Sequence, residues 1–475
     1  MPETKPAPQI IQGGMGVAVS NWCLARAVAR HGQLGVVSGT VIDTVLVRRL
    51  QDGDPGGHMR RGMLHFPIAR VAADALRRYF LPAGRPAGRG YRLLPIPRAK
   101  LTPARRELMM LAAFVEVWLA KEGHDGYVGM NLLTKVQIPT LPTLYGAMLA
   151  GVDYVLMGAG IPRDIPGALD LLAEHRPARL RFEVEGATDQ PGIDLVFDPA
   201  GHWDSLPPPL ARPRFLPIIA SNSLATLLAR KATGRVDGFV VEGPIAGGHN
   251  APPRGPARFN ERGEPLYGER DVVDLAGLKA LGLPFWVAGG AGHPENLRAA
   301  RAAGAAGVQV GTLFAYCEES GMAPQLRSSV LKHVMRNEVT VRTDARASPT
   351  GYPFKIVDWP ENPVHGMVRE RLCDLGYLRV AYRNPDDSIG YRCAAEPVDQ
   401  YLSKGGKLED TTDRQCLCNG LNAAVGLAQL REDGSVELPV VTSGDDLIGI
   451  AGFLAGRLHY SAAEVIDYLL EAVPA

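Results

Sequence analysis

The chain has 475 residues, of which 46% are hydrophobic and 21% are charged, and its formal net charge at pH 7 is +1. This length and composition are those of a soluble globular protein, with room for a barrel of about 250 residues plus additions or for two to three ordinary domains. The balanced charge favours neither a nucleic-acid partner nor an anionic membrane surface. No apolar run approaches the roughly 20 residues that span a bilayer, and the N-terminus lacks a signal-peptide pattern. We therefore expect a cytoplasmic protein.

Short apolar runs recur along the first two thirds of the chain and predict eight buried strands, at residues 10–15, 34–39, 127–131, 154–157, 216–220, 238–241, 285–288 and 308–310. Helical patterns are expected between most of them, at residues 21–31, 142–150, 165–174, 224–233, 275–281 and 295–303. Ser20 is a candidate cap of the first helix. Wholly apolar strands that alternate with helices indicate an α/β fold with a parallel sheet. Eight such units favour a closed TIM (β/α)8 barrel over an open doubly wound sheet.

Two stretches interrupt this repeat before the barrel pattern ends. Residues 51–123 are helical, basic and proline-rich, and residues 79–106 within them are expected to form a surface loop. Leu180, Phe182 and Val184 alternate with charged residues, as in a strand with one buried face, and with residues 195–197 they predict a hairpin.

The character of the chain changes again after about Ala345, where helical segments such as residues 462–472 follow. We therefore predict a barrel of residues 1–50 and 124–345, an insertion of residues 51–123 after the second strand, and a mainly helical C-terminal module or cap of residues 346–475.

Six cysteines do not make a disulfide framework in a chain of this length. Four of them lie in the C-terminal quarter: Cys373, Cys393, Cys416 and Cys418. Their spacing is not a standard zinc pattern. Reduced, unligated thiols are the favoured interpretation, with a metal or redox role as the alternative.

Glycine loops follow the last two predicted strands. Gly289 and Gly290 end the seventh, and Gly311 and Thr312 end the eighth. In β/α barrels these two loops often bind a phosphate, because glycine turns and helix N-termini present backbone N–H groups to an anion. The alternative is that the glycines only permit tight packing, but two such loops in tandem favour a phosphate site.

Two further segments end strands on the same barrel face. The loop Gly13-Gly14-Met15 follows the first strand, and its glycines would let a planar ring lie against the backbone, with Met15 as an apolar contact. Asn131 ends the third strand; it is either a ligand contact or a turn cap.

His249 follows the sixth strand and a glycine turn, Gly247-Gly248. Imidazole exchanges protons near neutral pH, and the glycines clear space beside it, so His249 is the candidate catalytic residue. The alternative is an ordinary hydrogen-bonded loop histidine. Glu242, on the strand itself, either orients the site or pairs with a cation. No cluster of His, Asp and Glu has metal-ligand spacing, so no metal site is predicted.

Together these segments resemble the nitronate monooxygenase family, formerly called 2-nitropropane dioxygenase, which is related to FMN-dependent enoyl-ACP reductases. The resemblance covers residues 9–40 and 126–320 and rests on four motifs, at residues 11–15, 242–249, 288–290 and 309–312. It implies a TIM barrel that holds FMN non-covalently.

The resemblance also implies roles for single residues. Gly289, Gly290, Gly311 and Thr312 would cradle the FMN phosphate; Gly13, Gly14, Met15, Asn131, Gly247 and Gly248 would line the flavin. His249 would stand beside the flavin as the catalytic base or substrate-binding residue. The chain departs from the pattern at Ser221, a predicted cofactor contact, where many relatives carry a lysine. A hydroxyl cannot supply that positive charge, so the flavin electronics differ or another cation substitutes.

The resemblance implies an FMN-dependent monooxygenase that converts a nitronate or nitroalkane with O2 to a carbonyl compound and nitrite. His249 would take the α-proton of the nitroalkane, or bind the nitronate as imidazolium. The first alternative is an enoyl-thioester reductase that uses NAD(P)H. An inactive binding barrel and a metal-dependent aldolase-like barrel are further alternatives. The expected partners are a nitronate or other carbon acid and O2, without nucleic acid or membrane, and a homodimer is left open.

Overall fold

Eight parallel strands form a closed barrel in the computed structural model, which describes residues 6–186 and 193–471. They are β1 (Ile10–Gln12), β2 (Gly35–Ser38), β3 (Val128–Leu133), β4 (Tyr154–Gly158), β8 (Arg214–Ile219), β9 (Phe239–Glu242), β10 (Phe285–Ala288) and β11 (Gly307–Val310). Their order is β1-β11-β10-β9-β8-β4-β3-β2. A parallel bridge between Ile11 and Leu34 closes the ring between its two end strands, with the Gln12 N–H donating to the Leu34 carbonyl at 2.9 Å. The predicted strands and the TIM barrel are confirmed.

The barrel interior is filled with side chains. Val36, Leu156, Val240 and Trp286 all belong to one buried cluster inside the ring, as the branched and aromatic layers of such barrels require. Since side chains alternate along a strand, Glu242 points to the same side as Val240, at the carboxyl end of β9. The packed interior leaves the mouth of the barrel as the place for a ligand.

Helices surround the barrel at or near their predicted positions: α1 (Trp22–Arg30), α6 (Thr140–Leu149), α7 (Ile165–Ala173), α8 (Asn222–Lys231), α9 (Leu275–Lys279) and α10 (Pro294–Ala302). The predicted cap of the first helix is wrong. Asn21 caps α1, accepting a hydrogen bond from the Leu24 N–H at 3.0 Å. Ser20 instead donates its hydroxyl to the Gly13 carbonyl at 2.8 Å.

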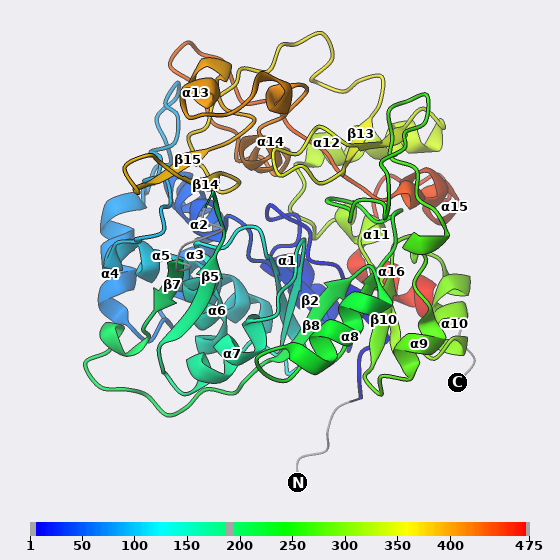
Figure 1. The fold of residues 1–475 in the computed structure, drawn as a ribbon, viewed down its shortest axis with the longest axis horizontal. Helices are drawn as coiled ribbons and strands as arrows, with labels where there is room; N and C mark the ends of the chain where they lie inside the picture. The colour runs from blue at the N-terminus through cyan, green and yellow to red at the C-terminus, as the bar shows by residue number, and fades with distance from the viewer. Residues whose placement is uncertain (1–5, 187–192, 472–475) are drawn as a thin grey trace.

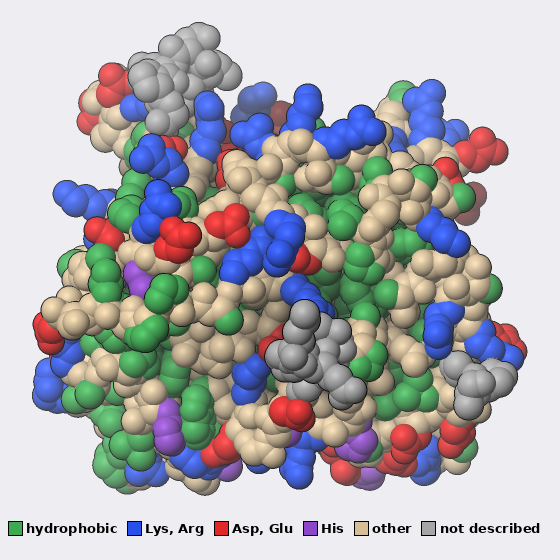
Figure 2. Space-filling model, turned by 90° about the horizontal axis from the view of Figure 1, so that it is seen from below, with side chains coloured by type: hydrophobic (Ala, Val, Ile, Leu, Met, Phe, Trp, Pro, Cys, Tyr) green, Lys and Arg blue, Asp and Glu red, His purple; other side chains and the backbone are tan. Residues whose placement is uncertain are grey.

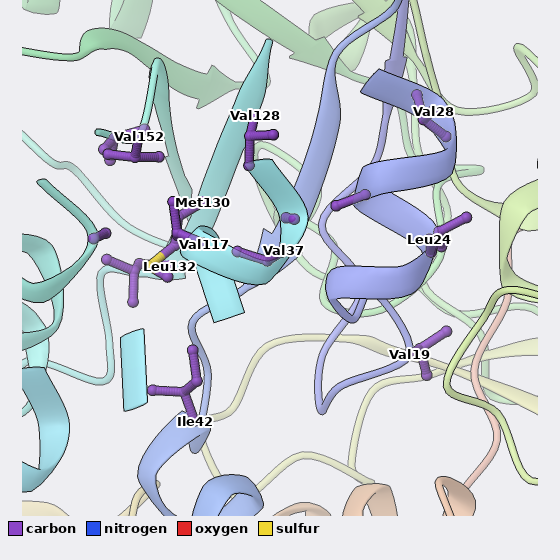
Figure 3. Packing of buried hydrophobic residues seen from close by; sticks show 14 of the residues in the cluster. Val19, Leu24, Val28, Val37, Ile42, Val117, Val128, Met130, Leu132 and Val152 are labelled. Carbon is purple, nitrogen blue, oxygen red and sulfur yellow. The ribbon is translucent and has the colours of Figure 1, made fainter. Parts of the chain in front are cut away.

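The segment between β2 and β3 contains α2 (Ile42–Gln51), η1 (Pro55–Gly57), α3 (His58–Met63), α4 (Ala69–Tyr79) and α5 (Pro103–Lys121). Although the sequence division places α5 in the insertion, this helix packs between α1 and α6. Figure 3 shows its Val117 beside Val37 of β2 and Met130 of β3. Helix α5 thus occupies the barrel-helix position between these strands. Residues 80–102 contain no helix or strand, as predicted for a loop, but Tyr91 and Leu94 are buried.

The predicted hairpin is confirmed: β5 (Ala178–Phe182) pairs antiparallel with β7 (Ile193–Phe197). Residues 187–192 lie outside the described residues. Val184 does not extend this hairpin, because β6 (Val184–Glu185) pairs in parallel with β14 (Val380–Arg383).

The chain after β11 contains both helices and strands: α11 (Thr312–Ala315), α12 (Pro324–Met335), β12 (Thr340–Asp344), β13 (Phe354–Asp358), β14, β15 (Ile389–Arg392), α13 (Val398–Ser403), η4 (Leu408–Thr411), α14 (Leu417–Ala424), η5 (Asp445–Ile450), α15 (Ala451–Leu454) and α16 (Ala462–Leu470). In Figure 1 its yellow and orange part lies along the top of the view, above the barrel. Leu447, Leu454 and Val465 belong to the same buried cluster as Val308 of β11. The C-terminal segment therefore shares the barrel's main core.

Charged side chains of both signs are interspersed over the face seen from below in Figure 2, in keeping with the near-zero net charge. In the part of the chain that the structure describes, we find no helix with the length and apolar character needed to cross a bilayer.

Candidate active site

A cavity opens at the carboxyl ends of the barrel strands and contains most of the predicted site. All but one of the predicted residues line it: Gly13, Gly14, Met15, Asn131, Gly247, Gly248, His249, Gly289, Gly290, Gly311 and Thr312. These residues come from the loops after β1, β9, β10 and β11 and from β3. The barrel closure brings together segments that are as much as 300 positions apart in the chain.

Ser221 is the exception and corrects the prediction for this position. Its hydroxyl caps α8 by accepting a hydrogen bond from the Leu224 N–H at 3.1 Å. It does not line the cavity, which β8 reaches through Ile218 instead. A capping serine at this point follows from the start of a helix directly after β8.

The N-terminal loop is held in place by Ser20. The Ser20 hydroxyl accepts from the Met15 N–H at 2.8 Å and from the Gln12 side-chain amide at 2.7 Å. A methyl group added to Gly14 would lie 2.2 Å from Cβ of Asn131. Gly14 is therefore required for the close approach of the loop to β3, and the structure brings Gly14 and Asn131 together as predicted.

Free backbone donors line the predicted phosphate side of the cavity. Gly289 and Gly290 have φ angles of +90° and +63°, which favour glycine. The N–H groups of Gly290, Ala291 and Thr312 donate to no other group in the described residues. Such groups at turns and helix starts suit an anion.

The Thr312 hydroxyl is not free on this side, because it donates to Asp446. Burial raises the pKa of the Asp446 carboxyl, whereas the bond from Thr312 lowers it, and the net direction is upward.

Three polar side chains of barrel strands face the cavity without a partner among the described residues: Asn131 of β3, Glu242 of β9 and Gln309 of β11. Ala288 of β10 is in register with both Glu242 and Gln309, so these two flank it at one level of the barrel. The buried Oε1 of Gln309 accepts no hydrogen bond. Since buried polar groups are normally hydrogen-bonded, the three side chains indicate a bound polar ligand.

Glu242 is uncharged at neutral pH. Burial raises the pKa of its carboxyl from 4.5 to about 8, because desolvation disfavours the ionised form. A protonated carboxyl both donates and accepts a hydrogen bond. Of the two sequence interpretations, orientation of a ligand therefore suits this group better than pairing with a cation.

His249 lies at the side of the cavity in contact with the C-terminal segment. Its Nε2 is 2.7 Å from Oγ of Ser348, and its ring meets the Phe354 ring edge-on at a centroid distance of 4.8 Å. Burial and, to a smaller extent, the positive charge of Lys135 together lower the pKa of His249 to about 4. At neutral pH the imidazole is therefore uncharged, which opposes the predicted imidazolium form and suits a proton acceptor.

Lys135 supplies a positive charge near the site that the barrel lacks at Ser221. Its ammonium group donates to the Thr350 carbonyl at 3.3 Å and lies 3.7 Å from the centre of the Tyr352 ring. Because the charge of Lys135 lowers the pKa of His249, this charge acts on the site. The sequence leaves a substituting cation open, and Lys135 after β3 is the cation whose charge acts on His249.

Segments beyond the barrel complete the cavity, and sequence reasoning missed them. Thr442 accepts from the Gly248 N–H at 2.9 Å, the Asp445 N–H donates to the Ile245 carbonyl at 3.0 Å, and Leu417 and Cys418 add a further wall. One sequence signal for this wall exists. The small polar run Thr442-Ser443-Gly444 follows two valines, a pattern typical of a loop at the end of a strand. The C-terminal segment thus forms part of the site.

The structure offers no metal centre within residues 6–186 and 193–471, since no three or more His, Cys, Asp or Glu side chains are placed to hold an ion. Cys373, Cys393, Cys416 and Cys418 are free thiols.

Residues 213–364 match the family model described as nitronate monooxygenase. This span includes the His249 loop, both predicted phosphate loops, Ser348 and Phe354. The resemblance drawn from the motifs is confirmed there, and with it the prediction of an enzyme. No curated protein sequence matches the chain significantly.

Solved structures with related topology include FabK from Thermotoga maritima, at 16% identity over 98% of this chain and 93% of that one, with a TM-score of 0.46. A nitroalkane oxidase from Streptomyces ansochromogenes has 14% identity over 98% of this chain and 96% of its own, with a TM-score of 0.44. Because both scores are below 0.5, the barrel assignment rests on the strand order and register described above.

Proposed function

We propose that this enzyme is an FMN-dependent oxidoreductase of nitronate monooxygenase type, which uses O2 to convert a nitronate or nitroalkane to a carbonyl compound and nitrite. The observation that carries the proposal is the composition of the cavity. It combines unpaired backbone N–H groups, three unpartnered polar side chains and an uncharged histidine, within the span that matches the family model.

The residues present fit FMN. Gly290, Ala291 and Thr312 offer N–H groups for the phosphate. Gly14 and Met15 offer a flat surface for the ring system, and the unpartnered side chains of Asn131, Glu242 and Gln309 offer hydrogen bonds to its polar edge. When bound, FMN supplies the electron transfer, and the protein supplies orientation and electrostatics.

His249 is the group that takes up the carbon-bound proton of a nitroalkane. The tautomer that is protonated on Nε2 donates to Ser348 and leaves the Nδ1 lone pair for this proton. Ser348 in turn shares a hydrogen bond of 2.8 Å with Oγ1 of Thr350, which fixes its own position. The low pKa leaves the lone pair free at neutral pH but also makes His249 a weaker base than an exposed histidine.

The test is the visible absorbance spectrum of the purified protein, before and after adding a preformed nitronate without oxygen. We expect the absorbance of a bound flavin, its loss on adding the nitronate, and nitrite once air is admitted. Bleaching by NADPH with turnover of an enoyl thioester, and none by the nitronate, would favour the reductase alternative. Colourless protein that does not take up FMN would contradict both.

A further inference from the structure

A second cavity, of about 1060 Å³, opens outside the barrel on the other side of the Cys416–Cys418 segment. Five arginines line it against three acidic residues: Arg342, Arg346, Arg369, Arg371 and Arg414, with Asp344, Glu370 and Asp413. Three of these arginines are paired with carboxylates, Arg342 with Asp344, Arg346 with Asp413 and Arg369 with Glu437. The cavity thus carries a surplus of positive charge.

Arg371 and Arg414 carry this surplus, since neither has a carboxylate at ion-pairing distance among the described residues. Backbone carbonyls hold both. Arg371 donates to Glu396 at 3.0 Å, to Thr411 at 3.1 Å and to Ala394. Carbonyl oxygens fix a guanidinium in place without neutralising its charge.

Arg414 is held in the same way, by the carbonyls of Asp410 at 3.0 Å, Arg346 at 2.7 Å and Ser348 at 2.5 Å. These bonds use its Nε and Nη1 and leave Nη2 without a partner among the described residues. A guanidinium has five N–H donors, so both arginines keep donors for a ligand. Burial lowers the pKa of Arg371 and Arg414, and a bound anion would offset this desolvation.

An apolar edge accompanies the charge. Phe259 and Met367 line the cavity with 53% and 59% of their surface exposed. An exposed aromatic ring is a stacking surface for a nucleobase. Rigid arginines with free donors and a nearby exposed ring are the two elements that a nucleoside phosphate requires.

We propose that this cavity binds the adenosine diphosphate group of a nucleotide ligand that the nitronate reaction itself does not use, with Arg371 and Arg414 on the phosphates and Phe259 against the adenine. Nicotinamide dinucleotides and coenzyme A thioesters both carry this group. Ser348 connects the two cavities, because its carbonyl accepts from Arg414 while its hydroxyl contacts His249. A ligand anchored here thus lies beside the segment that orients the catalytic histidine.

The test is calorimetric titration of the full-length protein with ADP, with inorganic pyrophosphate and adenosine as partial probes. We expect ADP to bind, Arg414→Ala to weaken it about 10-fold or more, and Phe259→Ala to weaken ADP but not pyrophosphate. Ala345→Glu adds a carboxylate to the lining and removes no hydrogen bond, so it should abolish binding even where Arg414→Ala fails to fold. Arg457→Ala, which removes an ion-paired arginine outside the cavity, is the control.

Titrations with NADPH and with an enoyl-coenzyme A distinguish the two sources, because the true ligand should bind more tightly than ADP. ADP that does not bind, or that binds equally to wild type, Phe259→Ala and Ala345→Glu, would overturn the proposal. These readouts do not depend on flavin absorbance, so failure here is distinct from failure of the proposed FMN chemistry.

Discussion

His249 and Ser348 are 99 residues apart in the chain, yet Nε2 of the imidazole lies 2.7 Å from Oγ of the serine. Ser348 is completely buried, so water cannot replace its hydroxyl. The contact joins the loop after β9 to the segment that follows β12, and it restricts the ring of His249 to one orientation.

Replacing Ser348 with alanine removes one hydrogen bond from His249 and leaves the cavity lining otherwise intact. We expect kcat to fall about 5- to 10-fold, since one hydrogen bond is worth about 1 kcal/mol, with FMN affinity unchanged. Ser403→Ala, at an exposed serine that bonds only to a backbone carbonyl, is the control. Wild-type kcat in Ser348→Ala would remove the serine from the orientation of His249.

Replacing His249 with asparagine removes the proposed base. Anaerobic flavin reduction by a nitroalkane should slow by about 10²- to 10⁴-fold. The preformed nitronate has already lost its proton, so its rate of flavin reduction should change far less. Stopped-flow absorbance measures both rates. Equal and undiminished rates with the two substrates would exclude His249 from proton transfer.

The same histidine predicts a pH dependence. Because its pKa is lowered to about 4, the imidazole stays neutral through pH 6 to 8 and gains its proton only as the pH approaches 4. The part of the nitroalkane rate that depends on His249 should therefore show no step near the ordinary histidine pKa of about 6.5. A step there that disappears in His249→Asn would contradict the buried, neutral state.

Glu242→Gln should stabilise the flavin-free protein in a pH-dependent way. Between pH 4.5 and 8 the unfolded chain ionises this carboxyl while the folded protein keeps it protonated, so the free energy of unfolding falls as the pH rises. Glutamine removes this penalty, which is about 3 kcal/mol at pH 7.

Urea denaturation of wild type and Glu242→Gln at pH 5 and pH 7 measures the effect, with the exposed Glu174→Gln as control. The stability difference should be small at pH 5 and larger at pH 7. A difference that does not change with pH would show that Glu242 is ionised in the folded protein.

Gly14→Ala should damage the cavity by overpacking. The added methyl would lie 2.2 Å from Cβ of Asn131 and 3.0 Å from Val36, so the loop after β1 must move. We expect a loss of about 1–3 kcal/mol in the free energy of unfolding and weaker FMN binding. Gly201→Ala, whose added methyl meets no atom within 4 Å, is the matched control. Unchanged stability and FMN affinity would contradict the close contact between Gly14 and Asn131.

Most of the barrel and its glycine loops could be predicted from the sequence because their signals are local. For example, residues 285–288 are an apolar run followed by Gly289 and Gly290, and this local pattern alone predicts a strand and a turn. The ring closure then places these loops together without further information. Ser221 was misassigned because a serine between a strand and a helix suits both a ligand contact and a cap, and only the helix start decides.

Most of the C-terminal contribution could not be predicted, because apart from the run Thr442-Ser443-Gly444 no local pattern encodes it. Ser348, Phe354 and Thr442 reach the cavity only because their segments pack over the barrel mouth. Their residue types are ordinary in loops and strands. The same applies to the pKa shifts of Glu242 and His249, which arise from burial and not from neighbours in the chain.

The bond between the Gly248 N–H and Thr442 has a consequence for biosynthesis. All eight barrel strands lie before residue 311, so they emerge from the ribosome before the C-terminal segment that completes their core. The wall made by residues 442–446 does not yet exist at that stage. A cofactor that enters early would meet an open groove, and its enclosure would wait until residues 442–446 emerge.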